Sequence, residues 1–322
     1  MPAEWETQSA VQLTIPHEHT DWAPILPEIM AVYEEMKREI SKREGLIVVA
    51  PEGTQLPSTV NCQQSTVNSN DTWARDHGFI TVEEDGELHL LDFRFNGWGE
   101  KFPADLDNEI NRHLFEQGMV QGIYEPHLDF VLEGGSIESD GKGTVFTTEC
   151  CLMAPHRNQP LSKQEIEQRL KAYLGAERIV WLQHGSLIGD DTDGHIDTLV
   201  RIAPNDTLLY TGGDEDHPDL MEMEKELQAL LTLEGKPYRL LKLPLPRPIY
   251  DNCQLNRLPA TYANYLVING AVLVPTYGQP DLDQEAMRII GEAFPDREIV
   301  GIDSRAVIKQ HGSLHCCTMQ YY

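Results

Sequence analysis

The C-terminal end of the chain holds a pair of cysteines next to a histidine. Cys316 and Cys317 follow His315 and end five residues before the last residue. A cysteine thiolate is a strong nucleophile when a base or a charged partner activates it. Apolar residues over 307–319 predict a buried closing strand, which would stop this chain end from fraying. A reactive thiol on such a strand needs partners from elsewhere in the chain.

Polar and acidic residues gather in three further segments. These segments are 70–78 (NDTWARDHG), 133–135 (EGG) and 189–197 (GDDTDGHID). Each comes just before the first strand of a predicted hairpin, so the three occupy equivalent places in the chain. Cysteine, histidine and carboxylates that meet in one cleft are typical of nucleophilic catalysis.

The elements that must position these residues form a repeat. Two short strands joined by a tight turn precede a helix and a third strand. The pattern occurs four times, and its second turn residues are 86, 141, 206 and 270, which gives spacings of 55, 65 and 64 residues. The predicted hairpins pair 79–82 with 88–95, 135–139 with 144–148, 196–202 with 207–211, and 265–268 with 271–274. The predicted helices span 104–116, 162–175, 220–230 and 282–293, and the third strands span 119–124, 178–182, 238–243 and 298–302.

A fifth unit is predicted from the two chain ends. The helix over 25–43 and the strand over 46–49 have no hairpin of their own. The strands predicted at 9–15 and 313–319 would supply it by pairing, which closes a ring of five units. The sequence therefore predicts a single α/β domain over residues 1–322 with pseudo-five-fold repeats of hairpin, helix and strand. Equivalent ends of such units converge on the axis, so the polar segments should meet Cys316 there.

Composition excludes some classes of partner. The formal net charge is −27, from 52 acidic and 25 basic residues. This disfavours nucleic acid and anionic membranes, which need clustered Lys and Arg. It would attract a cationic substrate, although solubility explains an acidic surface equally well. The N-terminus has no signal-peptide pattern and no run of 18 apolar residues occurs, so we expect a cytoplasmic protein without a membrane span.

The remaining cysteines and the acidic loop have simpler interpretations. Six cysteines at irregular spacing without a CxxC pair predict neither a disulfide framework nor a structural zinc site. Cys62, Cys150, Cys151 and Cys253 are expected to be inert buried thiols. The aspartates over 190–193 resemble a calcium loop, but the position that needs a closing Glu is Ile202. Trp73, Glu133 and His195 could each be structural, and only their shared place in the repeat favours a functional role.

Several motifs together resemble the agmatine deiminase family, which includes bacterial peptidylarginine deiminases and belongs to the guanidino-group-modifying superfamily. The resemblance spans nearly the whole chain and implies the five-bladed α/β propeller (pentein) fold. The motifs that carry it are Met1–Glu6, Trp73–Asp76, Phe95–Gly99, Glu133–Gly135, Asp190–Asp197, Ala293–Glu298 and His315-Cys316.

The resemblance also implies roles for individual residues. Cys316 would be the nucleophile and His195 the general acid and base. Asp76 and Asp197 would hold the guanidinium nitrogens, and Glu133 would orient His195 or the substrate. The implied substrate-binding residues are Trp73, Asp76, Asp197, Gly134 and Gly312. No metal or organic cofactor is implied.

The implied reaction is hydrolysis of agmatine, a small cationic guanidino compound, to N-carbamoylputrescine and ammonia in putrescine biosynthesis. It would proceed through a covalent cysteine thiouronium intermediate. The segment 310–313 (QHGS) departs from the glycine run and Asn common in the family, and Phe79 replaces a common Pro. The first departure leaves the exact substrate open.

Several alternatives remain at the level of sequence. Peptidyl or free arginine is an alternative substrate, because Arg75 and Arg94 lie near the motifs and could bind a carboxylate. A non-catalytic guanidino- or polyamine-binding protein, and a metal module built on His311, His315, Cys316 and Cys317, are further alternatives. Cys316 is preferred over Cys317 because adjacent side chains on a strand point to opposite faces. A homo-oligomer is possible.

Overall fold

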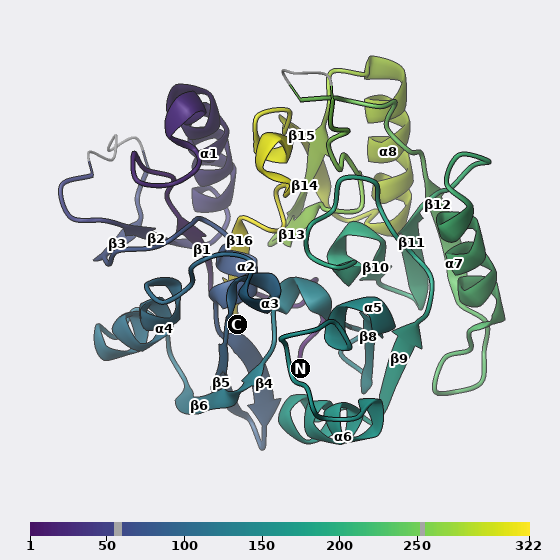
Figure 1. Cartoon of the computed structure of the whole chain (residues 1–322), viewed down its shortest axis with the longest axis horizontal. Coiled ribbons are helices and arrows are strands. Elements are labelled where there is room, and N and C mark those ends of the chain that lie inside the picture. Colours follow the sequence, from purple (N-terminus) through teal and green to yellow (C-terminus); the bar gives the residue numbers. More distant parts are fainter. Residues whose placement is uncertain (55–59, 252–254) are drawn as a thin grey trace.

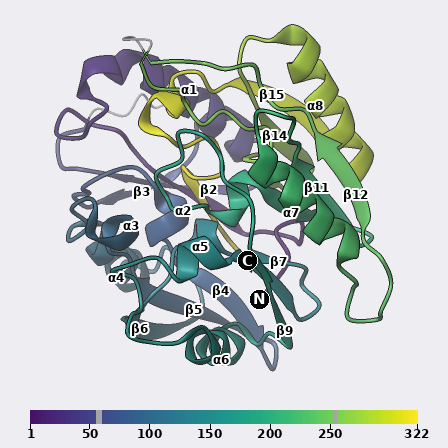
Figure 2. The same cartoon turned by 45° about the vertical axis from the view of Figure 1, so that its right-hand side comes forward.

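Five small mixed sheets surround the centre of the molecule in the part of the chain that the structure describes (Figure 1). The structure is a computed structural model that describes residues 1–54, 60–251 and 255–322. The longer helices lie on the outside of the ring, and the inner ends of the sheets face one another (Figures 1 and 2). Residues near the axis therefore come from all parts of the sequence.

Four of the sheets share one plan, as the repeat predicted. An antiparallel hairpin is followed by a helix, and the chain returns as a third strand parallel to the second. The strands are β4 (Ile80–Glu84), β5 (Glu87–Arg94) and β6 (Ile123–Val131); β7 (Glu138–Ser139), β8 (Thr144–Thr148) and β9 (Arg178–Leu182); β10 (Val200–Ala203), β11 (Thr207–Thr211) and β12 (Arg239–Leu243); β13 (Leu266–Ile268), β14 (Ala271–Thr276) and β15 (Glu298–Asp303). The connecting helices are α4 (Asp107–Glu116), α6 (Lys163–Leu174), α7 (Pro218–Ala229) and α8 (Pro280–Ala293).

Helix α6 illustrates how local sequence fixes these elements. A capping box begins the helix, because the Ser162 side chain accepts from the backbone of Glu165 and the Glu165 carboxylate accepts from the backbone of Ser162. Gly175 ends the helix in the left-handed conformation, with φ of 64°. Ile166 and Leu170 are buried on the inner face. Each such side chain stabilises the fold by about 1.5–3 kcal/mol.

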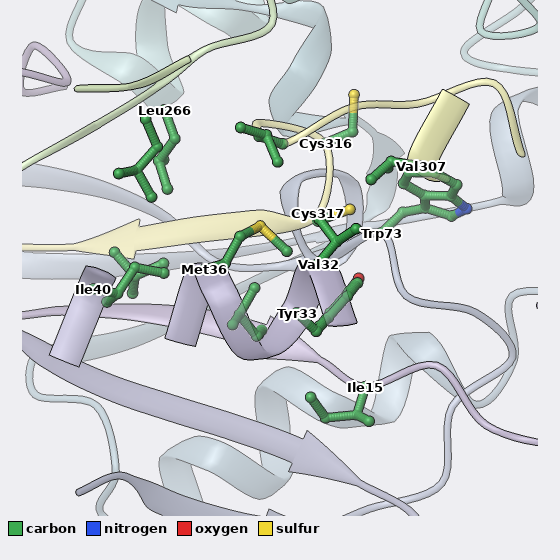
Figure 3. Packing of buried hydrophobic residues seen from close by; sticks show 14 of the residues in the cluster. Ile15, Val32, Tyr33, Met36, Ile40, Trp73, Leu266, Val307, Cys316 and Cys317 are labelled. Carbon is green, nitrogen blue, oxygen red and sulfur yellow. The ribbon is translucent and has the colours of Figure 1, made fainter. Parts of the chain in front are cut away.

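The two chain ends close the ring as predicted. Strand β16 (Thr318–Tyr321) pairs antiparallel with β1 (Ala10–Thr14), and β1 pairs parallel with β2 (Gly45–Ala50). Helix α1 (Leu26–Ser41) covers this sheet and packs into a cluster that contains Tyr33, Met36 and Cys317 (Figure 3). The predicted five-bladed α/β propeller is thereby confirmed, with an additional short strand β3 (Gln63–Thr66). The single-domain organisation stays a prediction.

The closing strand is shorter than predicted. It begins only at Thr318, whereas residues 312–317 form turns and loop. The chain bends here because the backbone amides of His315 and Cys316 are bonded to the side chain of Asn264 instead of to a neighbouring strand. The expected strand alternation therefore does not explain the different directions of Cys316 and Cys317.

Other differences also concern the inner ends of the blades. The first residues of the strands predicted at 135–139 and 196–202 form 3₁₀ turns instead, η2 (Gly134–Ser136) and η3 (Ile196–Thr198). The described residues also form three further short helices, α2 (Ala74–His77), α3 (Gly97–Glu100) and α5 (Glu149–Leu152), and two further 3₁₀ turns, η1 (Ala23–Ile25) and η4 (Val307–Gln310). The strand predicted at 119–124 begins at Ile123. Polar residues that precede the hairpins thus lie on tight turns near the axis.

Candidate active site

A cavity at the inner ends of the blades brings the predicted site residues together. Its empty volume is about 510 Å³. Of the five predicted catalytic residues, Cys316, His195, Asp76 and Asp197 line it, and Glu133 does not. The other lining residues are Asp21, Asp71, Trp73, Trp98, Phe102, Asp190, Asp191, Thr192, Thr198, Gln310, His311 and Gly312.

The Cys316 thiol lies among acceptors. Its Sγ is 3.4 Å from Asn264 Oδ1 and 3.7 Å from Asp197 Oδ2, and the residue is 6% exposed. Burial raises the pKa of this thiol well above its ordinary value, and the charges of Asp197 and Asp76 raise it further. The thiol is therefore neutral in this cavity. Cys317 is fully buried beside Tyr33 of α1 and does not line the cavity (Figure 3).

Asp197, on turn η3, has one carboxylate oxygen in a hydrogen bond and one without a hydrogen-bond partner among the described residues. Its Oδ2 accepts a hydrogen bond of 2.7 Å from His315 Nδ1. Its Oδ1 is buried and has no hydrogen-bond partner among the described residues. Burial opposes ionisation of Asp197, but the hydrogen bond and charge of His315 outweigh it, so its pKa is below the ordinary value. Asp197 is thus an ionised acceptor beside the sulfur.

Asp76, on the short helix α2, is the second carboxylate of the cavity. Its Oδ2 accepts from Trp98 Nε1 at 2.9 Å, and its Oδ1 accepts from the backbone of Gly135 at 3.0 Å. Burial raises the pKa of Asp76 to about 6, an effect that His195 partly offsets and the charge of Asp197 increases. Asp76 is therefore ionised at neutral pH, and a cation that binds nearby would stabilise its ionised form further.

His195 completes the group. Its Nδ1 lies 3.7 Å from Asp76 Oδ1, while its Nε2 is buried without a hydrogen-bond partner in residues 1–54, 60–251 and 255–322. Burial lowers the pKa of His195, but the negative charge of Asp76 more than compensates and the pKa lies well above its usual value. A charged imidazole with a free N–H can donate a proton to a leaving group.

Glu133 and Gly134 lie behind the cavity rather than in its wall. Both oxygens of the buried Glu133 accept from Arg157 Nε, at 3.0 and 3.3 Å. A role for Glu133 in orienting His195 fits this place, whereas direct contact with a substrate does not. Gly134 abuts the backbone of Arg75, since a Cβ built on it would lie 2.2 Å from that carbonyl oxygen. The predicted substrate contact of Gly134 is therefore not supported by its position.

Gly135, rather than Gly134, lies against side chains of the site, although it does not line the cavity. A Cβ on Gly135 would lie 2.6 Å from His195 Nδ1 and 2.9 Å from Asp76 Oδ1. Only glycine lets the backbone approach both side chains this closely. The EGG motif signalled such a site, but did not indicate which glycine faces it.

One group among the described residues offers metal-ligand atoms. Atoms of Glu133, Cys151 and His195 lie within 4.8 Å of one another. The Arg157 guanidinium already occupies Glu133, and a bound metal would have to displace it. Cys151, expected to be inert, thus lies next to His195. Cys150 is exposed, contrary to the prediction, because it lies on the outer side of the short helix α5, and Cys253 lies outside the described residues.

Aromatic rings form another wall of the cavity. Trp73 packs against Trp22 and Trp98, with ring centroids 5.6 and 6.5 Å apart. Gly312 fits against Trp73, because a Cβ there would come within 2.1 Å of the indole ring. The positions of Trp73 and Gly312 agree with the substrate-binding roles expected for them.

Sequence reasoning missed several contributors. Asn264 fixes the backbone of Cys316, and Trp98 donates to Asp76. His311, in a left-handed conformation with φ of 68°, donates from Nδ1 to Gly189 O at 2.7 Å and faces the half-buried Asp191. In the sequence, His311 appeared in the unusual segment 310–313 and in the alternative metal module, but not as part of the substrate cavity, while Asn264 lies in no motif.

The fold and this site define a ring-shaped α/β protein with a cysteine, a histidine and two carboxylates in an acidic cavity. The sequence model described as Porphyromonas-type peptidyl-arginine deiminase matches residues 1–321. The chain belongs to this family, which confirms the resemblance noted in the sequence.

The chain is similar to several relatives and solved structures over nearly its full length. The agmatine deiminase of Pseudomonas aeruginosa (strain LESB58) is 32% identical over 99% of this chain and 94% of its own, and that of Medicago truncatula is 32% identical over 99% and 95%. A Porphyromonas gingivalis structure, provisionally named an arginine deiminase, is 49% identical with a TM-score of 0.93 and covers 100% of this chain and 97% of its own. A Cys-to-Ser variant of the C. jejuni agmatine deiminase with substrate bound is 37% identical with a TM-score of 0.92, over 100% and 95%. A dimethylarginine dimethylaminohydrolase adduct, 14% identical with a TM-score of 0.55, covers 98% of this chain and 100% of its own and shares the fold.

Proposed function

We propose that this protein is an agmatine deiminase, which hydrolyses agmatine to N-carbamoylputrescine and ammonia. The observation that carries the proposal is the Cys316 thiol at two ionisable carboxylates in a cavity whose lining includes no Arg or Lys among the described residues. Several full-length relatives are themselves named agmatine deiminases. A cytoplasmic location and a homo-oligomer stay predictions.

The carboxylates suit the guanidinium end of the substrate. Asp197 Oδ1 and Asp76 can each accept N–H groups from a planar guanidinium, which fixes its central carbon near the sulfur. One carboxylate contact at ~4 Å is worth about 4 kcal/mol at an effective dielectric of ~20, before desolvation is subtracted. The bound cation also offsets the two negative charges that, together with burial, keep the thiol neutral, so substrate binding favours loss of the thiol proton to solvent.

The remaining steps use His195. Sulfur attack on the guanidinium carbon forms the C–S bond and moves the C=N electron pair onto nitrogen. His195 gives its proton to the departing nitrogen, which leaves as ammonia from a thiouronium intermediate. The neutral His195 then takes a proton from water as that water attacks the same carbon. The C–S bond breaks, its electrons return to sulfur, the hydroxyl proton of the adduct passes to that sulfur and restores the thiol, and the ureido product leaves.

The outer part of the cavity supports agmatine over free arginine. Agmatine carries an ammonium group at its far end, where arginine also has a carboxylate. Asp191 lines the cavity beside His311 and can pair with that ammonium. Arg75 and Arg94, the candidates for binding a carboxylate, lie outside the cavity lining. Within the described part of the cavity lining, a substrate carboxylate would therefore meet acidic residues and no arginine that could bind it.

The proposal is tested by measuring ammonia release and ureido product on agmatine, free arginine and an arginine-containing peptide side by side. We expect kcat/KM for agmatine to exceed both others by at least about tenfold, given one additional unpaired charge in the cavity. Activity confined to peptides or to arginine would overturn the assignment. Activity on none of the three would indicate a guanidino-binding protein.

A further inference from the structure

His315, directly before the proposed nucleophile, lies between two carboxylates. Its Nδ1 is 2.7 Å from Asp197 Oδ2, and its Nε2 is 2.8 Å from Oε2 of Glu4, in the N-terminal segment. The His315 side chain is 1% exposed. Glu4 and His315 are 311 residues apart in sequence, so segments near the two ends of the chain meet beside Asp197.

Both ring nitrogens of His315 must carry protons. A neutral imidazole has one N–H and would turn a lone pair toward the other carboxylate. Neither carboxyl supplies the missing proton: although burial opposes ionisation, the Arg201 guanidinium favours the ionised form of Glu4, and the charges of His195 and Arg201 favour the ionised form of Asp197. His315 is therefore an imidazolium shared by two carboxylates.

The charges around His315 balance. Glu4 also pairs with the Arg201 guanidinium, whose Nε lies 3.1 Å from Glu138 Oε2, and Arg75 Nε donates to the His315 carbonyl at 3.4 Å. Glu4, Glu138 and Asp197 are thus offset by His315, Arg201 and Arg75. Loss of the Glu4 charge would remove one of the two anions that keep His315 protonated.

Hydrogen bonds to neighbouring segments hold Glu4 in place. Its Oε1 accepts from the backbone of Val267 at 2.8 Å, and its own carbonyl accepts from Gln8 Nε2 at 2.6 Å. The first residues of a chain are usually poorly ordered unless they are tied down. Here the N-terminal motif Met1–Glu6, which the proposed mechanism leaves unused, aims a buried carboxylate at the site.

We propose that Glu4 is a positioning residue for the deimination reaction: it keeps His315 as an imidazolium, which in turn holds Asp197 ionised with its free oxygen turned to the substrate. The inference rests on the proposed function for its kinetic consequence, but not for the protonation of His315. Asp76 shows what Asp197 would become without this support, since Asp76 is equally buried, lacks an imidazolium hydrogen bond, and has a pKa raised to about 6.

The test compares Glu4→Gln with Glu138→Gln. Each variant removes one buried carboxylate that pairs with Arg201, but only Glu4 contacts His315. In Glu4→Gln, His315 becomes neutral and the pKa of Asp197 rises toward that of Asp76. We expect the acid limb of log kcat/KM against pH to become steeper by about one unit of slope than in the wild type, with a loss of about tenfold at the foot of the limb. Glu138→Gln should keep the wild-type slope.

A merely structural role of Glu4 would lower activity without changing this slope, so an unchanged slope in folded Glu4→Gln, or the same change in both variants, overturns the proposal. A second measurement is made on the wild-type protein and needs no activity. The ¹⁵N spectrum of histidine-labelled wild-type protein at pH 7 should show both His315 nitrogens protonated, with assignment by loss of the signals in His315→Gln. A single protonated nitrogen refutes the proposal even where Glu4→Gln fails to fold. Wild-type protein that is inactive on agmatine but shows the imidazolium would refute the proposed function alone.

Discussion

The indole nitrogen of Trp98 donates a hydrogen bond of 2.9 Å to Asp76 Oδ2, deep in the cavity. This bond favours the ionised carboxyl, whose pKa is raised to about 6 mainly by burial. Asp76 must be ionised to hold a guanidinium, so kcat/KM should fall as the pH drops through about 6. The relationship gives the ring of Trp98 an electrostatic function beyond packing.

Replacement of Trp98 by Phe should move the acid limb of kcat/KM to higher pH. The lost donor no longer stabilises the carboxylate, so the pKa of Asp76 rises, by about half a unit to one unit for one hydrogen bond. A pH series with agmatine measures the shift. Trp181→Phe, which loses a hydrogen bond to Glu167 away from the cavity, should leave the limb in place. A limb that does not move in Trp98→Phe would mean that Asp76 does not govern it.

Gly312→Ala should impair binding without unfolding the protein. The added Cβ would meet Trp73 at 2.1 Å, so the indole must move into the cavity. Overpacking of this kind costs about 1–3 kcal/mol, equivalent to at least about a fivefold loss in kcat/KM. Gly291→Ala serves as the control, because its nearest contact is an Ile299 side chain at 3.3 Å. Equal kcat/KM values in both variants would contradict a substrate-binding role for the contact between Gly312 and Trp73.

Asp191→Asn should raise KM for agmatine and leave kcat within about twofold. Asp191 is proposed to bind the far ammonium, which takes no part in bond breaking, so its contribution is the same in the ground and transition states. A half-exposed ion pair of this kind is worth about 1 kcal/mol, or about fivefold in KM. Asp129→Asn, at an exposed surface pair with Arg169, is the control. A fall in kcat with unchanged KM would place Asp191 nearer the reacting carbon.

Truncation after Cys317 should destabilise the whole ring. The deletion keeps the nucleophile but removes β16, whose residues Thr318–Tyr321 pair with β1. Lost ladder hydrogen bonds, lost burial of Met319 and Tyr321, and an open sheet edge should lower the melting temperature by more than about 5 °C. Cys316→Ala should melt close to the wild type. A truncated chain that melts like the intact chain would show that the ends do not close the fold.

The ring could be predicted because its information is local and repeated. Turn pairs such as Asn269-Gly270 and the capping box at Ser162 determine hairpins and helix starts without knowledge of distant residues. Their spacing then gave four units, and counting the unpaired elements gave the fifth. The shared place of Asp76, His195 and Asp197 before the first strands predicted that they would meet.

The parts that could not be predicted depend on contacts between distant residues. Asn264, which bends the chain before Thr318, is bonded to the amide of Cys316 from 52 residues away, and no local pattern marks it. Glu4 reaches His315 across 311 residues. The choice between Gly134 and Gly135 depends on the direction of one 3₁₀ turn, which two adjacent glycines leave undetermined.

The most direct test of the account is the mass of the enzyme quenched in acid during turnover with agmatine. The account predicts a covalent increment equal to agmatine minus ammonia on the peptide that contains Cys316 and Cys317. The increment should persist in Cys317→Ser, which keeps most of its activity, and disappear with all turnover in Cys316→Ser. An increment that survives in Cys316→Ser, or full ammonia release by that variant, would contradict Cys316 as the nucleophile and with it the proposed reaction.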